Sequence, residues 1–574
     1  MILAEKFSYS YPYKDLYENV TFTIEDYKHC AFIGSNGTGK STLVNILMNP
    51  EKYLYDGKIE ISEGTRIGFV SQFYEPDENN ETTVFDYLCE DFVRIQNELN
   101  DVCSQMETSQ DITSLFERYQ NILDQFDSMG GSDYEITIKK QLKTANLKHC
   151  ENLKLNGLSG GEFKLVQILK EMIVMPNLLI MDEPDVFLDF DNLDGLKNLI
   201  NSFKGTLLVI THNRFLLNSC FNKILHLENK EIQEFDGTYA EYNITLLKTK
   251  IELQELAAKD TEEIERNKKL VEKLTKDAAD FNNAALGRSL KARKSIVERL
   301  EARRIKAPFV DIRQPQIHFY TDTSGLSEPV IKVEDVNIGY DTTLLEHVTF
   351  EIGNNDKAAI VGPNGTGKTT LLREIFKNEH KRIKVGEDVC MAYLSQKHTE
   401  MFDGKEKVSD IFLKLGFDTK LEIKEYLSGF CFDEDIVESS VDKLSGGEKN
   451  LLQLSIIAKG NANVLLLDEP TSHLDTYAQL AMEKAVEEYN GAVLMISHDF
   501  ITIANCVDYV LLVEDNSIRK VSARKFRKMI YANHFDKDYL EKEQKRKELE
   551  NKIASALKDN DYEKAELLIQ DMQV

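Results

Sequence analysis

The chain has 574 residues, 42% of them hydrophobic and 29% charged, so it should fold as several globular units around separate cores. Its formal net charge is −27, with 97 acidic against 70 basic residues. A surface this acidic repels phosphate at long range, which excludes general nucleic-acid binding and means that any RNA contact needs a local basic patch.

The eight cysteines are scattered and form no CxxC pair, which argues against a disulfide framework and a zinc site. No apolar run approaches the roughly 20 residues that a membrane-spanning helix needs. The N-terminal residues also lack the pattern of a signal peptide. We therefore expect a cytoplasmic protein without a membrane domain.

A glycine-rich loop follows an apolar strand at 30–33 and opens a helix, the context of a phosphate-binding loop. Its glycines would let backbone N–H groups surround phosphates, and the helix N-terminus adds positive potential. Lys40 would reach the β and γ phosphates of ATP, and Ser41 would ligate Mg²⁺. The loop consists of Gly34, Ser35, Asn36, Gly37, Thr38, Gly39, Lys40, Ser41 and Thr42.

Farther along, residues from about Val84 to Gln125 have helical apolar spacing with many polar positions between. We expect an inserted helical arm there; a longer surface loop is the alternative. A second apolar strand at 177–181 ends at Asp182 and Glu183. Asp182 would hold Mg²⁺ through water and Glu183 would orient or deprotonate the attacking water, although either acid could instead cap a helix.

A charged stretch without proline runs from about Tyr242 to Lys306 and predicts a helical hairpin. Its first helix, 244–280, would span on the order of 55 Å at 1.5 Å per residue. Residues 280–287 form a break. The second helix, 288–306, carries eight basic and two acidic residues. A solvated helix face is the usual interpretation of charge, but a one-signed cluster favours phosphate contact. The candidate RNA contacts are Arg288, Lys291, Arg293 and Lys294.

The second half of the chain repeats the first. Leu158-Ser-Gly-Gly-Glu162 recurs as Leu444-Ser-Gly-Gly-Glu448, and the Asp-Glu pair recurs as Asp468 and Glu469, both with an offset of 286 residues. The phosphate loop recurs with a larger offset because the arm lengthens the first half by about 38 residues. Thr369 and Asp468 would hold the second Mg²⁺. The second loop consists of Gly362, Pro363, Asn364, Gly365, Thr366, Gly367, Lys368, Thr369 and Thr370.

The repeated Leu-Ser-Gly-Gly-Glu motif makes sense as a second phosphate-binding helix N-terminus that is supplied across an interface. With it, nearly the whole chain resembles the ABC ATPases, and the resemblance implies two ATP molecules sandwiched between two cassettes. Lys40 and Glu183 would face the second signature motif, and Lys368 and Glu469 the first. The signature residues are Ser159, Gly160, Gly161, Ser445, Gly446 and Gly447.

The same resemblance assigns further residues. Gln72 and Gln396 match the Q-loop that contacts nucleotide and Mg²⁺, and His212 and His498 match the catalytic switch histidine near the γ-phosphate. Tyr11 and Tyr340 are candidates to stack on adenine, with Tyr13 competing with Tyr11 and an ordinary core aromatic as the alternative for each.

The first cassette departs from the family pattern. It reads Asp182-Glu-Pro-Asp-Val-Phe-Leu-Asp189 where the second reads Asp468-Glu-Pro-Thr-Ser-His-Leu-Asp475, and its switch histidine precedes Asn213 where the second precedes Asp499. We expect both sites to bind ATP, and we hypothesise that they turn over unequally.

Two cassettes, a helical arm, a long hairpin after Gly237-Thr-Tyr239-Ala-Glu-Tyr242 and a charged helical C-terminus resemble the ABC-F family. That resemblance implies an ATP-bound form in the tRNA exit site of the ribosome, contacting rRNA and peptidyl-site tRNA, in translation regulation or protection from antibiotics. We expect a monomer with intramolecular cassette pairing and no DNA partner. The alternatives are the ATPase subunit of a transporter, a DNA-associated ABC ATPase and a nucleotide-binding module that never hydrolyses.

The expected fold is α/β, with two tandem P-loop ABC-type domains joined by a long α-helical hairpin. The predicted domains are cassette 1 at 1–243 with its arm at about 84–125, the linker at 244–328, cassette 2 at 329–532, and a C-terminal helical extension at 533–574.

Overall fold

The computed structural model divides by its contacts into two units, Met1–Thr238 with Arg313–His534, and Tyr239–Ile312 with Phe535–Val574. The first unit holds both cassettes. The structure describes residues 2–11, 14–71, 81–107, 112–186, 188–281, 291, 294, 314–321, 328–339, 343–397, 401–402, 404–534, 545, 548–549, 552–553, 555–556 and 561–572.

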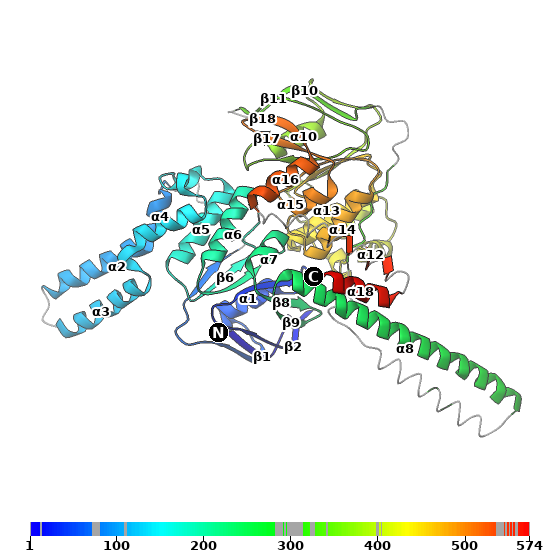
Figure 1. Ribbon diagram of the computed structural model, residues 1–574, viewed down its shortest axis with the longest axis horizontal. Helices are drawn as coiled ribbons and strands as arrows, with labels where there is room; N and C mark the ends of the chain where they lie inside the picture. The colour runs from blue at the N-terminus through cyan, green and yellow to red at the C-terminus, as the bar shows by residue number, and fades with distance from the viewer. Residues whose placement is uncertain are drawn as a thin grey trace. The chain divides into compact units, whose positions relative to one another are not determined.

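Cassette 1 contains a six-stranded sheet of order β5-β6-β7-β3-β8-β9 and a three-stranded antiparallel sheet of order β2-β1-β4 (Figure 1). In the larger sheet only the edge strand β9 is antiparallel. The strands are β1 (Ile2–Tyr11), β2 (Lys14–Ile24), β3 (His29–Gly34), β4 (Asp56–Ile61), β5 (Ile67–Val70), β6 (Leu178–Asp182), β7 (Thr206–Ile210), β8 (Lys223–Glu228) and β9 (Glu231–Asp236).

Strands β3, β6 and β7 are short, apolar and buried, as parallel strands covered on both faces must be. Because they are neighbours in the sheet, their carboxyl ends bring the phosphate loop, Asp182 and His212 to one edge. The helices of this cassette are α1 (Lys40–Met48), α2 (Val84–Met106), α3 (Ile112–Ser128), α4 (Tyr134–Thr144), α5 (Gly160–Ile173), α6 (Phe190–Ser202) and α7 (Arg214–Cys220).

Cassette 2 repeats this architecture, with sheet orders β14-β15-β16-β12-β17-β18 and β11-β10-β13. The duplication predicted from the motif offsets is therefore confirmed. Its strands are β10 (Ile331–Gly339), β11 (Thr343–Ile352), β12 (Lys357–Val361), β13 (Ile383–Val385), β14 (Met391–Leu394), β15 (Val464–Asp468), β16 (Ala492–Ile496), β17 (Tyr509–Glu514) and β18 (Ser517–Ser522). Its helices are α10 (Lys368–Lys377), α11 (Val408–Lys414), α12 (Lys420–Ser428), α13 (Gly446–Lys459), α14 (Thr476–Glu488), α15 (Phe500–Cys506) and α16 (Ala523–His534).

The inserted segment of cassette 1 is a helical arm, as predicted, and not a surface loop. Helices α2 and α3 lie side by side (Figure 1). At the base of the arm, Phe92 stacks on Tyr134 with ring centroids 4.6 Å apart and contacts Phe126 edge to face. The helices at the corresponding place in cassette 2, α11 and α12, have only 7 and 9 residues.

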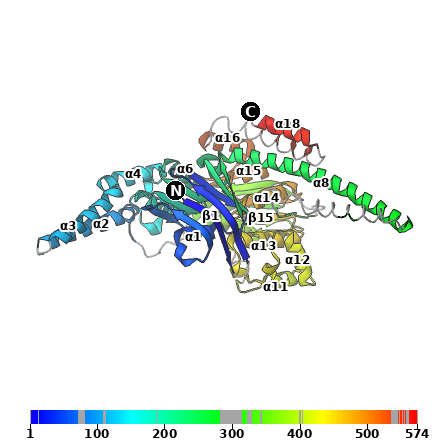
Figure 2. The ribbon, with the colours of Figure 1, turned by 90° about the horizontal axis from the view of Figure 1, so that it is seen from below.

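The second unit contains α8 (Tyr239–Phe281), a helix of 43 residues that begins five residues before the predicted start. Glycine and proline, the strongest helix breakers, are absent from it. Ile251 of α8 packs with Ala565 and Ile569 of α18 (Tyr562–Met572), and with Ile553 and Ala556. Figure 2 shows α18 alongside α8. The C-terminal helical extension therefore braces the first part of the linker helix.

Only part of the predicted basic helix is described. Lys291 and Lys294 are helical and exposed. Arg288 and Arg293 lie outside the described residues. The basic character of the segment therefore remains an argument from sequence, to which the structure adds the exposure of these two lysines.

Candidate functional site

The two phosphate loops have the same geometry. Gly37 and Gly39 have φ of 73° and 108°, a left-handed backbone that glycine adopts without strain, and Gly365 and Gly367 repeat it. Each loop runs into a helix that begins at its lysine. Lys40 is buried, and its Nζ donates to the carbonyl oxygens of Gly34 and Ser35, both at 2.9 Å.

Lys368 does the same in cassette 2, donating to the carbonyl oxygens of Gly362 at 2.8 Å and Pro363 at 2.7 Å. Burial lowers the pKa of both lysines although carboxylates lie nearby, among them Asp475 and Glu183 for Lys40 and Glu469 and Asp189 for Lys368. Both loops therefore present a cation and a helix N-terminus to one point, which suits a polyphosphate.

Each site also pairs a hydroxyl with a buried carboxylate, the oxygen donors that Mg²⁺ prefers. The hydroxyl of Thr369 donates to Oδ1 of Asp468 at 3.2 Å, and Ser41 hydrogen-bonds Asp182. Oδ1 of Asp182 is buried and has no hydrogen-bond partner among the described residues. These pairs fit a bound Mg²⁺ ion. Gln396 lines the cavity beside Thr369, whereas Gln72 lies outside the described residues.

The signature motifs open helices α5 and α13. Ser159 and Ser445 cap them, each within a reciprocal capping box completed by Glu162 or Glu448. The backbone N–H of Ser159 donates to Oε2 of Glu162 at 2.8 Å, and that of Ser445 donates to Glu448 at the same distance. A Cβ atom added at Gly160 would meet nothing within 4 Å, so this helix N-terminus faces open space.

The phosphate loop of each cassette contacts the other cassette. The backbone N–H of Asn36 donates to Oδ2 of Asp475 at 2.9 Å, and its side-chain amide donates to the carbonyl oxygen of His473 at 2.7 Å. In the reciprocal contact the N–H of Asn364 donates to Oδ2 of Asp189 at 3.1 Å. A Cβ atom on Gly447 would lie 2.2 Å from Nδ2 of Asn36, so only glycine fits there.

A cavity of about 470 Å³ lies on the cassette 2 site and is lined from both cassettes, a size that suits a small-molecule ligand. Cassette 2 contributes its phosphate loop, Glu469 and His498, and cassette 1 contributes Gly160, Leu188 and His212. The cavity thus brings Lys368 and Glu469 together with Gly160 of the first signature motif.

The comparisons with known proteins agree with this geometry. The family model described as ABC transporter matches residues 17–186 and 345–472. The chain is an ABC-F type member of the ABC family. As such it carries two ABC ATPase domains, which implies ATP hydrolysis.

The relatives span nearly all of the chain. It is 29% identical over 501 residues to the energy-dependent translational throttle protein EttA of Mycobacterium tuberculosis (strain ATCC 25618 / H37Rv), covering 85% of this chain and 86% of the relative. It is also 29% identical over 537 residues to ABC transporter F family member 5 of Arabidopsis thaliana, covering 90% and 75%.

Among solved structures, one described as a model of ribosome-bound archaeal Pelota and ABCE1 matches with a TM-score of 0.55 and 18% identity over 92% of this chain and 80% of that one. This likeness shows the fold. No helix in the described part of the ABC-F chain is long and apolar enough to cross a bilayer.

The glutamates of the two Asp-Glu pairs in this ABC-F protein have different surroundings, although φ is positive at both. Burial raises the pKa of Glu183, but the neighbouring His473, His212 and Lys40 outweigh it, so the pKa lies below its usual value. Nδ1 of His473 lies 3.6 Å from Oε2 of Glu183. Burial and the neighbouring Asp468 raise the pKa of Glu469 to about 8.

The cause of this asymmetry is visible in the sequence positions. His473 belongs to cassette 2 and reaches Glu183 of cassette 1, whereas the corresponding residue of cassette 1 is Phe187, which has no imidazole and lies outside the described residues. Asp499 adds negative charge near Glu469, where cassette 1 has the neutral Asn213. In the nucleotide-free protein Glu183 is therefore the better proton acceptor of the two at neutral pH.

The switch histidines are buried and neutral. Burial and Lys40 lower the pKa of His212 to about 4, and burial and Lys368 lower that of His498 to about 3. Both ring nitrogens of His212 have no hydrogen-bond partner within the described part of the chain. The backbone N–H of His498, not its ring, donates to Oε2 of Glu469 at 3.2 Å. A neutral imidazole here can donate one hydrogen bond to a γ-phosphate.

Two predicted adenine contacts stay predictions. Tyr11 ends β1, is 46% exposed and stands edge to face with Tyr9 at 5.3 Å, so an adenine could reach its ring. Tyr340 and Tyr13 lie outside the described residues. The contacts of His473 and Asp475 were not predicted from sequence; His473 was marked by the difference from Phe187, whereas Asp475 matches Asp189 and gave no such signal.

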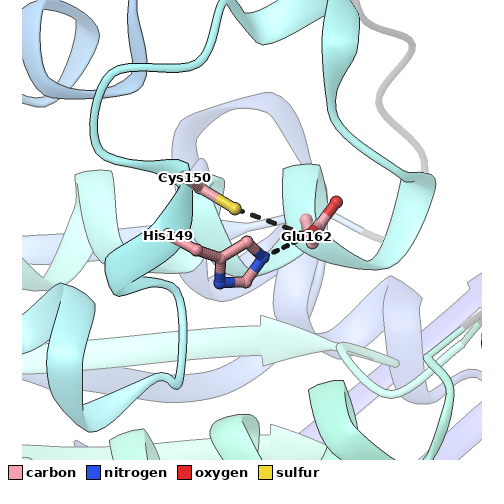
Figure 3. Close-up of side chains that lie close together, drawn as sticks. All are labelled: His149, Cys150 and Glu162. Atoms are coloured by element: carbon pink, nitrogen blue, oxygen red, sulfur yellow. Dashed lines mark hydrogen bonds and ion pairs between the residues drawn. The ribbon is translucent and has the colours of Figure 1, made fainter.

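The first signature helix has an additional brace (Figure 3). Nε2 of His149 lies 2.9 Å from Oε1 of Glu162, and the thiol of Cys150 donates to the same oxygen at 3.4 Å. The three ligand atoms lie within 4.8 Å of one another, but burial and Glu162 raise the pKa of Cys150 to about 12, so at neutral pH it is a thiol donor. Asp435 and Ile436 occupy these positions in cassette 2, which therefore lacks this brace.

The opposite pKa shifts predict opposite effects of charge removal on the stability of the nucleotide-free protein. Because the pKa of Glu469 is raised in the folded state, ionisation of Glu469 lowers the free energy of unfolding as pH rises from 4.5 through about 8. Glu469→Gln should therefore raise the melting temperature of the protein at pH 8 by about 2 °C or more. Glu183, with a lowered pKa, contributes stability above pH 4.5, so Glu183→Gln should lower it. Changes in melting temperature of the same sign for Glu183→Gln and Glu469→Gln at pH 8 would refute the difference between the two glutamates.

The same asymmetry predicts unequal turnover. Because Glu183 is the better proton acceptor, Glu183→Gln should remove the larger share of steady-state ATPase activity, with the two single variants differing by about threefold or more, since a general base is worth about 10²–10⁴-fold. Phosphate-release assays at saturating ATP measure this. Matching losses in the two variants would remove the hypothesis of unequal sites.

Proposed function

We propose that this ABC-F protein is an ATP-switched ribosome factor that occupies the tRNA exit site, with its interdomain hairpin directed toward tRNA in the peptidyl site. The name of its relative EttA, a translational throttle protein, supports a role in translation. Within that role we favour protection of the ribosome from antibiotics over translation regulation, and both remain open to the test below.

The observation that carries the proposal is the composite character of the ATP sites. Asn36 and Asn364 hydrogen-bond Asp475 and Asp189 of the opposite cassette, so a nucleotide on either loop is also a ligand of the facing cassette. A nucleotide that contacts both cassettes binds the closed state more tightly and therefore favours it. Bound Mg²⁺, held by Ser41 with Asp182 and by Thr369 with Asp468, would neutralise phosphate charge.

Closure would shape the surface that meets the ribosome, and hydrolysis would release it. Glu183 and Glu469 would take the proton of the attacking water, while the neutral His212 and His498 would donate to the γ-phosphate. Loss of that phosphate removes the link between each lysine and the facing signature helix. The energy of ATP then sets the timing of binding and release.

Helix α8 supports contact with RNA. Its 43 residues span about 65 Å at 1.5 Å per residue, and the basic segment 288–306 follows it in a chain of net charge −27. Exposed lysines at 291 and 294 are available to phosphate oxygens. This one-signed cluster provides the local attraction that the acidic remainder of the surface cannot.

The alternatives fit less well. A transporter motor or a DNA-associated ATPase gives no reason for a 43-residue helix between cassettes, and the chain has no CxxC zinc module. A module that never hydrolyses would not need the two glutamates beside their magnesium-site aspartates. The proposal predicts behaviour that none of these three classes shares.

The test is co-sedimentation with ribosomes of the Glu183→Gln/Glu469→Gln variant, which retains its phosphate loops. It should pellet with ribosomes when ATP is present and remain in the supernatant without nucleotide. Reversing Arg288, Arg293 and Lys294 to glutamate should weaken pelleting by about tenfold or more at moderate salt, because each lost phosphate contact reduces affinity.

The matched control reverses Lys381, Lys384 and Arg382, an exposed basic cluster of cassette 2, and should leave pelleting unchanged. Failure of the ATP-trapped variant to pellet would contradict the ribosome role. Normal pelleting of the hairpin reversal would contradict the part assigned to the hairpin. Comparing the drug sensitivity of cells with and without the protein, across several ribosome inhibitors, then separates protection from regulation.

A further inference from the structure

A buried ion cluster joins the two cassettes beside both switch histidines. Arg214, the first residue of α7, lies two residues after His212, and its side chain is 9% exposed. Its guanidinium donates to Glu483 of α14, to Oδ2 of Asp499 at 3.0 Å and to the hydroxyl oxygen of Thr502 at 3.3 Å. All three acceptors belong to cassette 2, and Asp499 directly follows His498.

The three acceptors are also held by hydrogen bonds within cassette 2. Nδ2 of Asn505 donates to Oε2 of Glu483 at 2.8 Å, and the hydroxyl of Thr502 lies 2.8 Å from both Glu483 and Asp499. The two carboxylate oxygens of Asp499 make different contacts. Its Oδ1 accepts from the N–H groups of Ile501 and Thr502 and so caps α15, which leaves Oδ2 for Arg214 and the Thr502 hydroxyl.

The cluster exists on one side of the cassette interface. Applying the offset of 286 residues to Arg214, Glu483, Asp499 and Thr502 gives Phe500, Lys197, Asn213 and Leu216. Asn213 still caps α7 by accepting from the N–H groups of Phe215 and Leu216, but it carries no charge. The reciprocal position has lost both the cation and the anions, so an equivalent ion cluster cannot form there.

Removing one member of a buried ion cluster leaves the others charged and desolvated, which is far more costly than removing a surface pair. Removal of Arg214 should therefore affect the two nucleotide sites unequally. The first turn of α7 keeps its Asn213 cap without Arg214, whereas Oδ2 of Asp499, next to His498, loses its charged partner and keeps the Thr502 hydroxyl. The backbone N–H of His498 in turn donates to Oε2 of Glu469, at 3.2 Å.

We propose that Arg214 is a positioning residue for ATP hydrolysis at the cassette 2 site, acting across the interface through Asp499 to place the switch loop that carries His498. Asp499 lines the nucleotide cavity, whereas Arg214, Glu483 and Thr502 do not, so the cluster connects the cassette interface to that cavity. The inference rests on the ATP-hydrolysing part of the proposed function and not on the ribosome.

The test measures each site separately in the full chain. In the Glu183→Gln background turnover comes from the cassette 2 site, and in the Glu469→Gln background it comes from the cassette 1 site. Adding Arg214→Met should lower kcat of the cassette 2 site by about tenfold or more while changing that of the cassette 1 site much less, because small misplacement of a catalytic group costs rate steeply. KM for ATP should change little, since Arg214 touches neither phosphate loop.

Two further variants keep the result interpretable. Arg214→Lys keeps the charge and should restore part of the lost kcat. Lys223→Met removes another buried cation of cassette 1, paired with Glu25 and Glu234 on the sheet, and should leave the ratio between the sites unchanged. Thermal melts verify that each variant is folded, and Arg214→Met/Glu483→Gln replaces Arg214→Met if the single variant does not fold.

Equal loss at both sites, or unchanged turnover in Arg214→Met, would overturn the proposal. A selective loss at the cassette 2 site that Arg214→Lys partly restores would support it. The outcome is independent of ribosome binding, because these assays contain no ribosomes. A failed co-sedimentation experiment would therefore leave this inference standing, and the reverse also holds.

Discussion

The structure depends on one constraint: the phosphate loop of each cassette lies against residues of the opposite cassette. Two hydrogen bonds make these contacts: the N–H of Asn36 donates to Asp475, and the N–H of Asn364 donates to Asp189. They place each phosphate loop against the opposite signature helix, and the requirement for glycine at Gly447 shows how close that approach is.

The two cassettes share one fold, but the charged residues at their interface differ. His473 crosses the interface to Glu183, Asp499 stands near Glu469, and Arg214 ties the switch loop of cassette 2 to α7 of cassette 1. Each of these contacts lacks its duplicate, since Phe187, Asn213 and Phe500 occupy the reciprocal positions. A duplicated chain can thus keep two binding sites while assigning them different rates, because binding rests on backbone geometry and turnover on a few side chains.

Much of the fold could be predicted from sequence because backbone motifs carry local signals. The offset of 286 residues located the repeated strands and helices, and apolar spacing revealed the arm. The contacts that set the pKa values could not be predicted, because His473 and Glu183, or Arg214 and Glu483, meet only after hundreds of intervening residues have folded. Gln72, Tyr340, Arg288 and Arg293 remain predictions from sequence.

The most direct test of the composite sites is a structure of the Glu183→Gln/Glu469→Gln variant with ATP and Mg²⁺. We predict two nucleotides, one between Lys40 and Ser445 and one between Lys368 and Ser159, each with its γ-phosphate contacting the facing serine or the glycines after it. Nucleotides bound to the phosphate loops alone, with Ser159 and Ser445 directed away from any triphosphate, would contradict the account.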